Sequence, residues 1–292
     1  MTRTPVFIHV GYPKTATTWL QTRVFPAHSG ILYENADRVF GDLPKTAAPE
    51  AQIRDEVDAL RGGTELPVLF SFEALIGMFL PSPGEGNKRR NPHEIAASLK
   101  RIIPDARILI TIRDQADLVE STYLQYVFGG YSARPEKAMA DQVWNDAFLD
   151  YDKLVQTYED LFGSQNVWVG AYEQLKTRPL DFLDSIFGFM EVAPVELETS
   201  ALTARDNVGT SRFMFWFIRM FNTYWPNRLQ MKPSWHSFCL RTFKRMDKLL
   251  GGRKPGSQWL TEGAINLSAY AAGNRELNRR RKLNLEDYGY LL

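Results

Sequence analysis

Cysteine is almost absent from this sequence, because Cys239 is the only one in 292 residues. A single cysteine excludes an internal disulfide and a cysteine-based metal cluster, and it fits a protein of a reducing compartment. Histidine is also scarce, and the four histidines are scattered without the spacing of a metal site. We therefore expect no bound metal.

The sequence also has no excess of positive or negative charge. Thirty-five basic residues face thirty-four acidic ones, which gives a formal net charge of +1. No overall field attracts nucleic acid, so any anion site must be local. Long apolar runs are missing too: no window approaches the roughly 20 apolar residues of a membrane span, and the beginning MTRTPVFIHVG lacks the apolar stretch of a signal peptide. We expect a soluble cytoplasmic protein.

The chain does contain short β-branched or aromatic runs that alternate with helical patterns. The runs predict strands at Val6–Val10, Val68–Phe72, Arg107–Ile112 and Val167–Ala171. The helical patterns cover Pro92–Ile103, Gln115–Phe128, Ala138–Phe162 and Pro179–Met190. Strands that are apolar on both faces and alternate with helices predict a parallel sheet covered on both sides. We expect one α/β domain over residues 1–292, with an α/β core at 5–208 and a mainly helical part at 209–292.

The stretch GYPKTATTWLQ follows the first predicted strand and leads into a helix. A loop of this kind presents unpaired backbone N–H groups at the positive end of the helix, which is an anion site. Lys14 adds a mobile positive charge, and the threonines add hydroxyl groups. The pattern differs from the nucleoside-triphosphate loop G-x-x-x-x-G-K-[ST], because the lysine precedes the small residues and the second glycine is missing. No magnesium-binding arrangement is evident.

The loop follows the pattern Y-P-K-[ST]-x-T-T-W and lies between a strand and a helix. In this it resembles the corresponding segment of the cytosolic and carbohydrate sulfotransferases that use 3′-phosphoadenosine 5′-phosphosulfate (PAPS). The resemblance implies a P-loop-like sulfotransferase fold of the bacterial type. It also implies that the loop binds the 5′-phosphosulfate and that Lys14 reaches the oxygen bridging phosphate and sulfate. The residues carried over are Lys14, Thr15, Ala16, Thr17, Thr18 and Trp19, with Trp19 near the adenine. The family usually has serine and glycine at positions 15 and 16, so we expect a slightly bulkier turn.

A second segment, RILITIRDQADLVESTY, is similar to the family's 3′-phosphate motif. Arg113 and Ser121 occupy the matching positions, and Gln115 replaces the usual proline. In VWVGAYEQLK, Tyr172 falls where the family has a tyrosine near the adenine ring. The basic triplet R-K-G of the cytosolic branch is absent, and Arg205 is the residue that would replace it.

The resemblance also suggests the general base. The cytosolic branch has a histidine just past its second strand, and VLFSFEAL places Glu73 there. Several carbohydrate and protein-tyrosine sulfotransferases use a glutamate in this role. Glu34, in ILYENAD, is the alternative base, because glycosaminoglycan-type relatives carry theirs about twenty residues past the loop lysine. His9 lies within the first strand and is interpreted as a packed core histidine.

The last part of the chain has no motif that indicates its role. SRFMFWFIRMFNTYW is apolar nearly all round, which predicts core packing, a homodimer contact or a peripheral membrane contact through residues 212–225. The run NRRRK at 278–282 is either a solvated helix face or a guide for an anionic glycan.

The resemblance implies an enzyme that transfers a sulfuryl group from PAPS to a hydroxyl by in-line displacement. The products would be a sulfate ester and adenosine 3′,5′-bisphosphate (PAP). A glycan, a lipid and a small molecule all remain open as acceptors. Two other classes remain open: a P-loop kinase or nucleotide-processing enzyme that uses ATP and magnesium, and a non-catalytic PAP-binding protein.

Overall fold

The computed structural model describes residues 3–43, 49–76, 91–128, 130–140, 146–195, 211–224, 242, 243, 245 and 266–292. These residues belong to two compact units. The first unit combines Met1–Gln115, Trp144–Ala204 and Leu267–Leu292, and the second combines Ala116–Val143 and Arg205–Asn266. That the whole chain is one domain stays a prediction.

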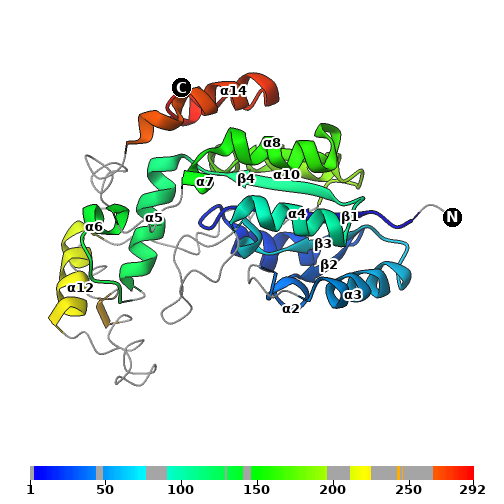
Figure 1. The fold of residues 1–292 in the computed structure, drawn as a ribbon, viewed down its shortest axis with the longest axis horizontal. Helices are drawn as coiled ribbons and strands as arrows, with labels where there is room; N and C mark the ends of the chain where they lie inside the picture. Colours follow the sequence, from blue (N-terminus) through cyan, green and yellow to red (C-terminus); the bar gives the residue numbers. More distant parts are fainter. Residues whose placement is uncertain are drawn as a thin grey trace. The chain divides into compact units, whose positions relative to one another are not determined.

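A five-stranded parallel sheet forms the centre of the first unit (Figure 1). Its strands are β1 (Val6–His9), β2 (Leu32–Asn35), β3 (Val68–Ser71), β4 (Arg107–Ile112) and β5 (Val167–Ala171), in the order β2-β3-β1-β4-β5. Ile8 of β1 lies opposite Phe70 of β3 and Ile108 of β4. The chain turns toward β2 and β3 after β1 and reaches the other side of β1 only with β4. The carboxyl ends of β1 and β4 therefore flank a topological switch point, where open α/β sheets bind ligands.

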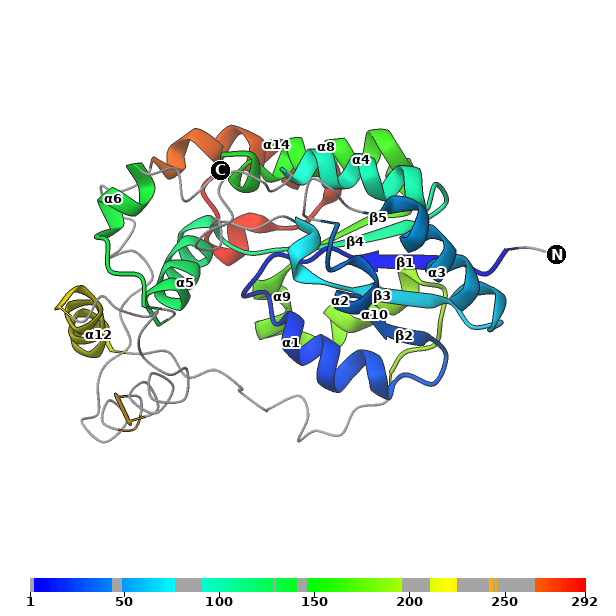
Figure 2. The ribbon, with the colours of Figure 1, turned by 60° about the horizontal axis from the view of Figure 1, so that its bottom comes forward.

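Helices cover both faces of this sheet, which confirms the predicted fold class (Figure 2). The face with α4 (Pro92–Ile102) and α8 (Tyr151–Phe162) also has α14 (Ala271–Arg281), which packs on α8. The opposite face carries α1 (Thr17–Trp19), α9 (Tyr172–Thr177) and α10 (Pro179–Phe189). The strands β1, β3 and β5 are buried along their whole length, because side chains on both of their faces pack under helices.

The remaining elements are short, except for α3. They are α2 (Asp37–Phe40), α3 (Glu50–Gly62), α7 (Asp146–Leu149), a π-helical turn η1 (Leu20–Val24), and the 3₁₀ turns η2 (Phe25–Ala27), η3 (Glu73–Ile76), η4 (Ser164–Asn166), η5 (Leu267–Tyr270) and η6 (Leu285–Tyr288). Since η1 and η2 follow α1 directly, residues 17–27 form one continuous helical segment.

Two arginines of the basic run at 278–282 are used inside the first unit. Arg280 on α14 forms ion pairs with Asp152, at 2.5 Å, and with Glu159 on α8. Arg281 pairs with Glu159 as well. Neither Arg280 nor Arg281 therefore belongs to a solvated helix face or is available to attract a glycan, because their ion pairs hold α14 to α8.

The second unit contains most of α5 (Gln115–Phe128), with α6 (Pro135–Ala140) and α12 (Arg212–Tyr224). Asn222 on α12 donates from its amide to the carbonyls of Val127, at 2.7 Å, and Tyr131, at 3.1 Å. Trp216, Met220 and Tyr224 lie on an exposed side of α12. A dimer or membrane contact through residues 212–225 stays a prediction. Within the described residues, no helix has the length and apolar character needed to cross a bilayer.

One strand was not predicted, and two sequence expectations need correction. The strand β2 was not predicted, because Leu32–Asn35 is only partly buried and has no apolar run. A single helix over Ala138–Phe162 is wrong, because α7 ends at Leu149 and the Asp150 side chain caps a new helix by accepting the Lys153 N–H at 3.1 Å. The sequence also predicts a loop at Thr46–Ala51, and this prediction is wrong at its end, because α3 begins at Glu50. The sequence further predicts loops at 81–92 and 251–257 and a helix at 237–250. The loop at 251–257 lies outside the described residues, as does most of the other two segments.

Candidate functional site

The loop between β1 and α1 has an unusual backbone. Lys14 and Ala16 adopt left-handed dihedrals, with φ of 67° and 60°, although neither is glycine. Alternation of such residues with right-handed ones turns successive N–H groups toward one point and makes an anion-binding concavity. Ala16 is also the N-cap of α1, and it makes no side-chain capping bond. The first N–H groups of this helix are therefore not satisfied by their own cap, as an anion site requires.

The strand under this loop supports it through His9, which is fully buried. His9 Nδ1 is 2.8 Å from Ser71 Oγ on β3, and Nε2 is 3.1 Å from Thr111 Oγ1 on β4. Burial lowers the pKa of His9 to about 4, so the ring is neutral at pH 7. A Cβ atom on Gly11 would lie 2.5 Å from His9 Nε2, so only glycine fits there. The prediction of a packed core histidine is confirmed.

The three threonines of the loop have different surroundings. Thr15 is buried and donates its hydroxyl to the Tyr12 carbonyl at 2.5 Å, so this side chain stabilises the turn itself. Thr17 donates its hydroxyl to Glu73 Oε2 at 2.9 Å. Thr18 is exposed. The Thr17 hydroxyl therefore connects the loop to one of the two candidate bases.

Glu73 and Glu34 lie at different distances from the loop along the sheet. Glu73 begins η3, directly after β3, which is a neighbour of β1. Glu34 lies on the edge strand β2, opposite Phe70, and β3 separates it from β1. The structure thus brings Glu73 to the loop and leaves Glu34 one strand farther away.

Arg113 follows β4 and reaches the same loop from the other side. Its guanidinium donates to the Lys14 carbonyl at 3.0 Å and lies 5.1 Å from the centroid of the Tyr172 ring. Its own carbonyl accepts a hydrogen bond from Tyr151 at 2.6 Å. Lys14, Arg113 and Tyr172 come from three distant parts of the sequence, and the structure brings them together at the carboxyl edge of the sheet.

Glu173 is a site residue that sequence reasoning missed. Its carboxylate is buried and accepts hydrogen bonds from the Asp114 N–H, at 3.3 Å, and from the Tyr290 hydroxyl, at 3.0 Å. Burial raises the pKa of Glu173. The only signal in the sequence was its position next to Tyr172 in the dipeptide YE.

The other predicted site residues are distributed as follows. Trp19 is partly buried and packs, with Ala16 and Tyr172, against the core under α1 and α10. Ser121 lies on α5 in the second unit and is partly buried. Arg205 lies outside the described residues. The described part of the chain contains no group of three or more metal-ligating side chains.

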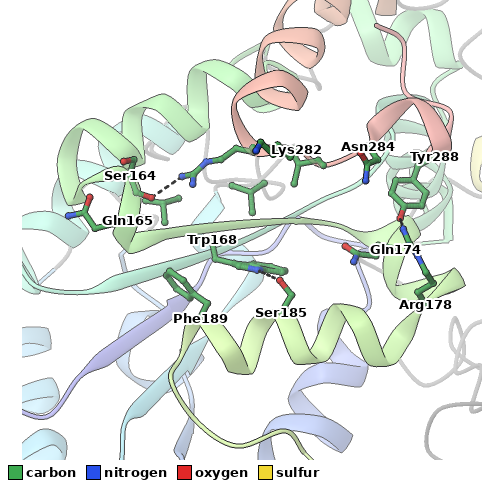
Figure 3. Close-up of a pocket in the computed structure, with 14 residues that line it drawn as sticks. Ser164, Gln165, Trp168, Gln174, Arg178, Ser185, Phe189, Lys282, Asn284 and Tyr288 are labelled. Carbon is green, nitrogen blue, oxygen red and sulfur yellow. Dashed lines mark hydrogen bonds between the residues drawn. The ribbon is translucent and has the colours of Figure 1, made fainter.

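A cavity of about 400 Å³ lies along β5, which is the outer strand of the sheet (Figure 3). Arg178 and Tyr288 close one end through a hydrogen bond of 2.8 Å, and Trp168 donates to Ser185 at 2.8 Å. None of the predicted site residues lines this cavity. We place the functional site at the loop and Arg113, because the converging charges and N–H groups are there.

Comparisons with known proteins give one family match and several similar solved structures. A family model described as "Sulfotransferase family" matches residues 5–196. No curated protein matches the chain. Similar solved structures include a sulfotransferase from Alicyclobacillus acidocaldarius, at 19% identity and a TM-score of 0.49, over 69% of this chain and 89% of that one. Mouse sulfotransferase SULT7A1 complexed with PAP has 15% identity and a TM-score of 0.39, over 68% and 61%. The sulfotransferase domain of the Synechococcus PCC 7002 olefin synthase has 16% identity and a TM-score of 0.43, over 87% and 98%.

The family match extends from the start of β1 to a point beyond α10, so it includes the loop, Glu73, Arg113 and Tyr172. It covers well over half of the sequence. The chain belongs to the sulfotransferase family.

Proposed function

We propose that this sulfotransferase uses PAPS as donor and a hydroxyl group of a glycan, a lipid or a small molecule as acceptor, and that it releases PAP. The observation that carries the proposal is the 2.9 Å hydrogen bond from Thr17 to Glu73. It joins a carboxylate, which can accept a proton, to a loop built to hold an anion.

The residues around the loop fit the two ends of such a donor. The N–H groups of residues 14–18 and the Lys14 ammonium would hold the 5′-phosphosulfate. Arg113 would bind the 3′-phosphate, because a guanidinium matches a terminal phosphate with two parallel hydrogen bonds. Ser121 and Arg205 are proposed to assist it. Trp19 and Tyr172 supply aromatic surface for the adenine.

When bound, PAPS supplies a sulfuryl group attached to a phosphate leaving group. Glu73 accepts the proton of the acceptor hydroxyl while the acceptor oxygen forms its bond to sulfur and the bond from sulfur to the bridging oxygen breaks. The Lys14 ammonium compensates the negative charge that develops on the leaving phosphate oxygen. The proposal assigns no step to a metal. We also propose a cytoplasmic location, which the scarcity of cysteine favours.

Calorimetric titration of the full chain tests the donor assignment. We expect PAP to bind more tightly than ADP, with no change when a chelator is added. A preference for ADP or ATP that depends on magnesium would instead identify a kinase or another nucleotide-processing enzyme. If PAP binds but no acceptor in a library of glycans, lipids and alcohols receives labelled sulfate, the protein is a non-catalytic PAP binder.

The role of Glu73 gives a separate prediction. Glu73→Gln keeps the size of the side chain and its hydrogen bond with Thr17 but cannot take the proton. We expect kcat to fall by about 100-fold or more, while the affinity for PAP changes little. Glu34→Gln is the matched control and should retain normal turnover. The opposite pattern, with Glu34→Gln inactive and Glu73→Gln active, would assign the base to Glu34.

A further inference from the structure

The segment from α14 to residue 291 returns to the loop that follows β4. Two of its side chains, Asn274 and Tyr290, are almost completely buried, with exposures of 1% and 5%. Asn274 bonds directly to Gln115, which is 159 positions away in the sequence, and Tyr290 bonds to Glu173, which in turn bonds to Asp114.

The first link is a reciprocal pair of buried amides. Gln115 Nε2 donates to Asn274 Oδ1 at 2.7 Å, and Asn274 Nδ2 donates to Gln115 Oε1 at 3.1 Å. The same two nitrogens also donate to the carbonyls of Leu149, at 3.3 Å, and Leu291, at 2.9 Å. A buried polar network with every donor satisfied favours one arrangement of its members, because any shift leaves a buried group without a partner.

The second link runs through Glu173. One oxygen of its carboxylate accepts the Tyr290 hydroxyl, and the other accepts the N–H of Asp114, the residue next to Arg113. On the other side, Tyr151 holds the Arg113 carbonyl at 2.6 Å. The carbonyl and the N–H of the Arg113–Asp114 peptide bond are thus both held by hydrogen bonds. Loss of the Tyr290 hydroxyl would leave a buried carboxylate with one hydrogen-bond donor fewer, and this favours a shift of the loop.

We infer that Tyr290 and Asn274 are positioning residues for Arg113, and that this C-terminal segment determines how well the protein distinguishes nucleotides with a 3′-phosphate from those without one. Neither side chain needs to touch the nucleotide. Each acts through the backbone that carries the guanidinium. The inference rests on the proposed function, in which Arg113 binds the 3′-phosphate.

Titration calorimetry with PAP and with adenosine 5′-monophosphate tests this inference on the full chain. Wild type should bind PAP more tightly, because only PAP has the 3′-phosphate. Tyr290→Phe keeps the ring and removes the hydroxyl, and we expect it to weaken PAP binding about tenfold, the cost of losing one hydrogen bond to a buried carboxylate. Binding of the monophosphate should stay within about twofold of wild type, since it has no 3′-phosphate for the Arg113 guanidinium to bind.

Tyr288→Phe is the matched control. It makes the same chemical change two residues away, but the Tyr288 hydroxyl bonds Arg178 rather than Glu173. This variant should preserve both affinities. Asn274→Ala cuts the other link and should act in the same direction as Tyr290→Phe, which gives a second measurement if Tyr290→Phe does not fold.

These measurements distinguish a failure of this inference from a failure of the proposed function. If Tyr290→Phe and Asn274→Ala weaken both nucleotides equally, or neither, the segment is only structural and the inference is wrong. If wild type itself does not prefer PAP to the monophosphate, the assignment of Arg113 and the proposed function fail, and the inference fails with them.

Discussion

Ala16 occupies a backbone conformation that side chains usually avoid. Its φ of 60° and ψ of 23° lie in the left-handed region, which costs a residue with a Cβ atom roughly 1–2 kcal/mol. Glycine pays no such cost, and the resembling family usually has glycine here. Ala16 therefore adopts the backbone conformation of the anion loop at a cost in strain. Lys14, two positions earlier, has a left-handed backbone as well.

Ala16→Gly should consequently stabilise the protein. We expect the free energy of unfolding to rise by about 0.5–1 kcal/mol, which is the relief of left-handed strain less the greater chain entropy of glycine. Urea unfolding measures this change. Ala59→Gly, on the exposed side of α3, is the control and should lower the same quantity by about 1 kcal/mol. A loss of stability in both variants would contradict the assigned strain.

Individual site residues differed in how well the sequence revealed them. Lys14 and Arg113 stand directly after apolar strands in recognisable spacing, so local pattern was enough to propose them. The partners of these residues were not visible. Thr17 and Glu73 are 56 positions apart, and Glu173 and Tyr290 are 117 apart. Hydrogen bonds over such separations depend on the arrangement of the whole sheet, which no local window contains.

At the scale of elements, the three central strands are joined by one side chain. His9 on β1 contacts Ser71 on β3 and Thr111 on β4, and Gln21 from η1 donates to Ser71 Oγ at 3.0 Å. This network ties the ends of three strands to the helical segment that follows the anion loop. The His9 imidazole of this network is fully buried and neutral.

The buried histidine makes stability depend on pH. In the unfolded chain His9 takes up a proton below about pH 6.5, whereas burial lowers its pKa to about 4 in the folded protein. Its contribution is therefore present above pH 6.5 and is lost as the pH falls from 6.5 toward 4. We expect a loss of about 2 kcal/mol in the free energy of unfolding between pH 7.5 and pH 5.

Urea unfolding of wild type and His9→Gln at both pH values isolates this effect, because the other titrating groups are common to the two proteins. The variant should lack that part of the pH dependence. Equal losses in the two proteins would show that His9 is not the responsible group.

Elements were predictable from sequence where their pattern was continuous. Strands β1, β3, β4 and β5 are apolar runs, and all four were found within one residue of their bounds. The edge strand β2 contains Glu34 and Asn35 among partly exposed residues, so it has no such run. The break at Asp150 was hidden because the apolar spacing continues across it, and only the capping bond ends one helix and starts the next.

At the scale of the whole molecule, the order β2-β3-β1-β4-β5 explains why the site draws on distant parts of the chain. The anion loop and Arg113 follow strands that are neighbours in the sheet but about a hundred residues apart in the sequence. The alternation of strands and helices predicted the parallel sheet. It gave no indication that residues 267–292 return to the first unit, because Asn274 and Tyr290 belong to no motif.

The packing of residues 267–292 on the rest of the first unit affects when the site is complete during protein synthesis. A ribosome produces the anion loop before Arg113, and it produces Arg113 before Tyr290. Until residue 290 has emerged, the Glu173 carboxylate lacks the hydrogen bond from the Tyr290 hydroxyl, and the stretch that carries Arg113 lacks this support. Under the proposed function, full affinity for PAP should therefore arise only after residue 290 has left the ribosome.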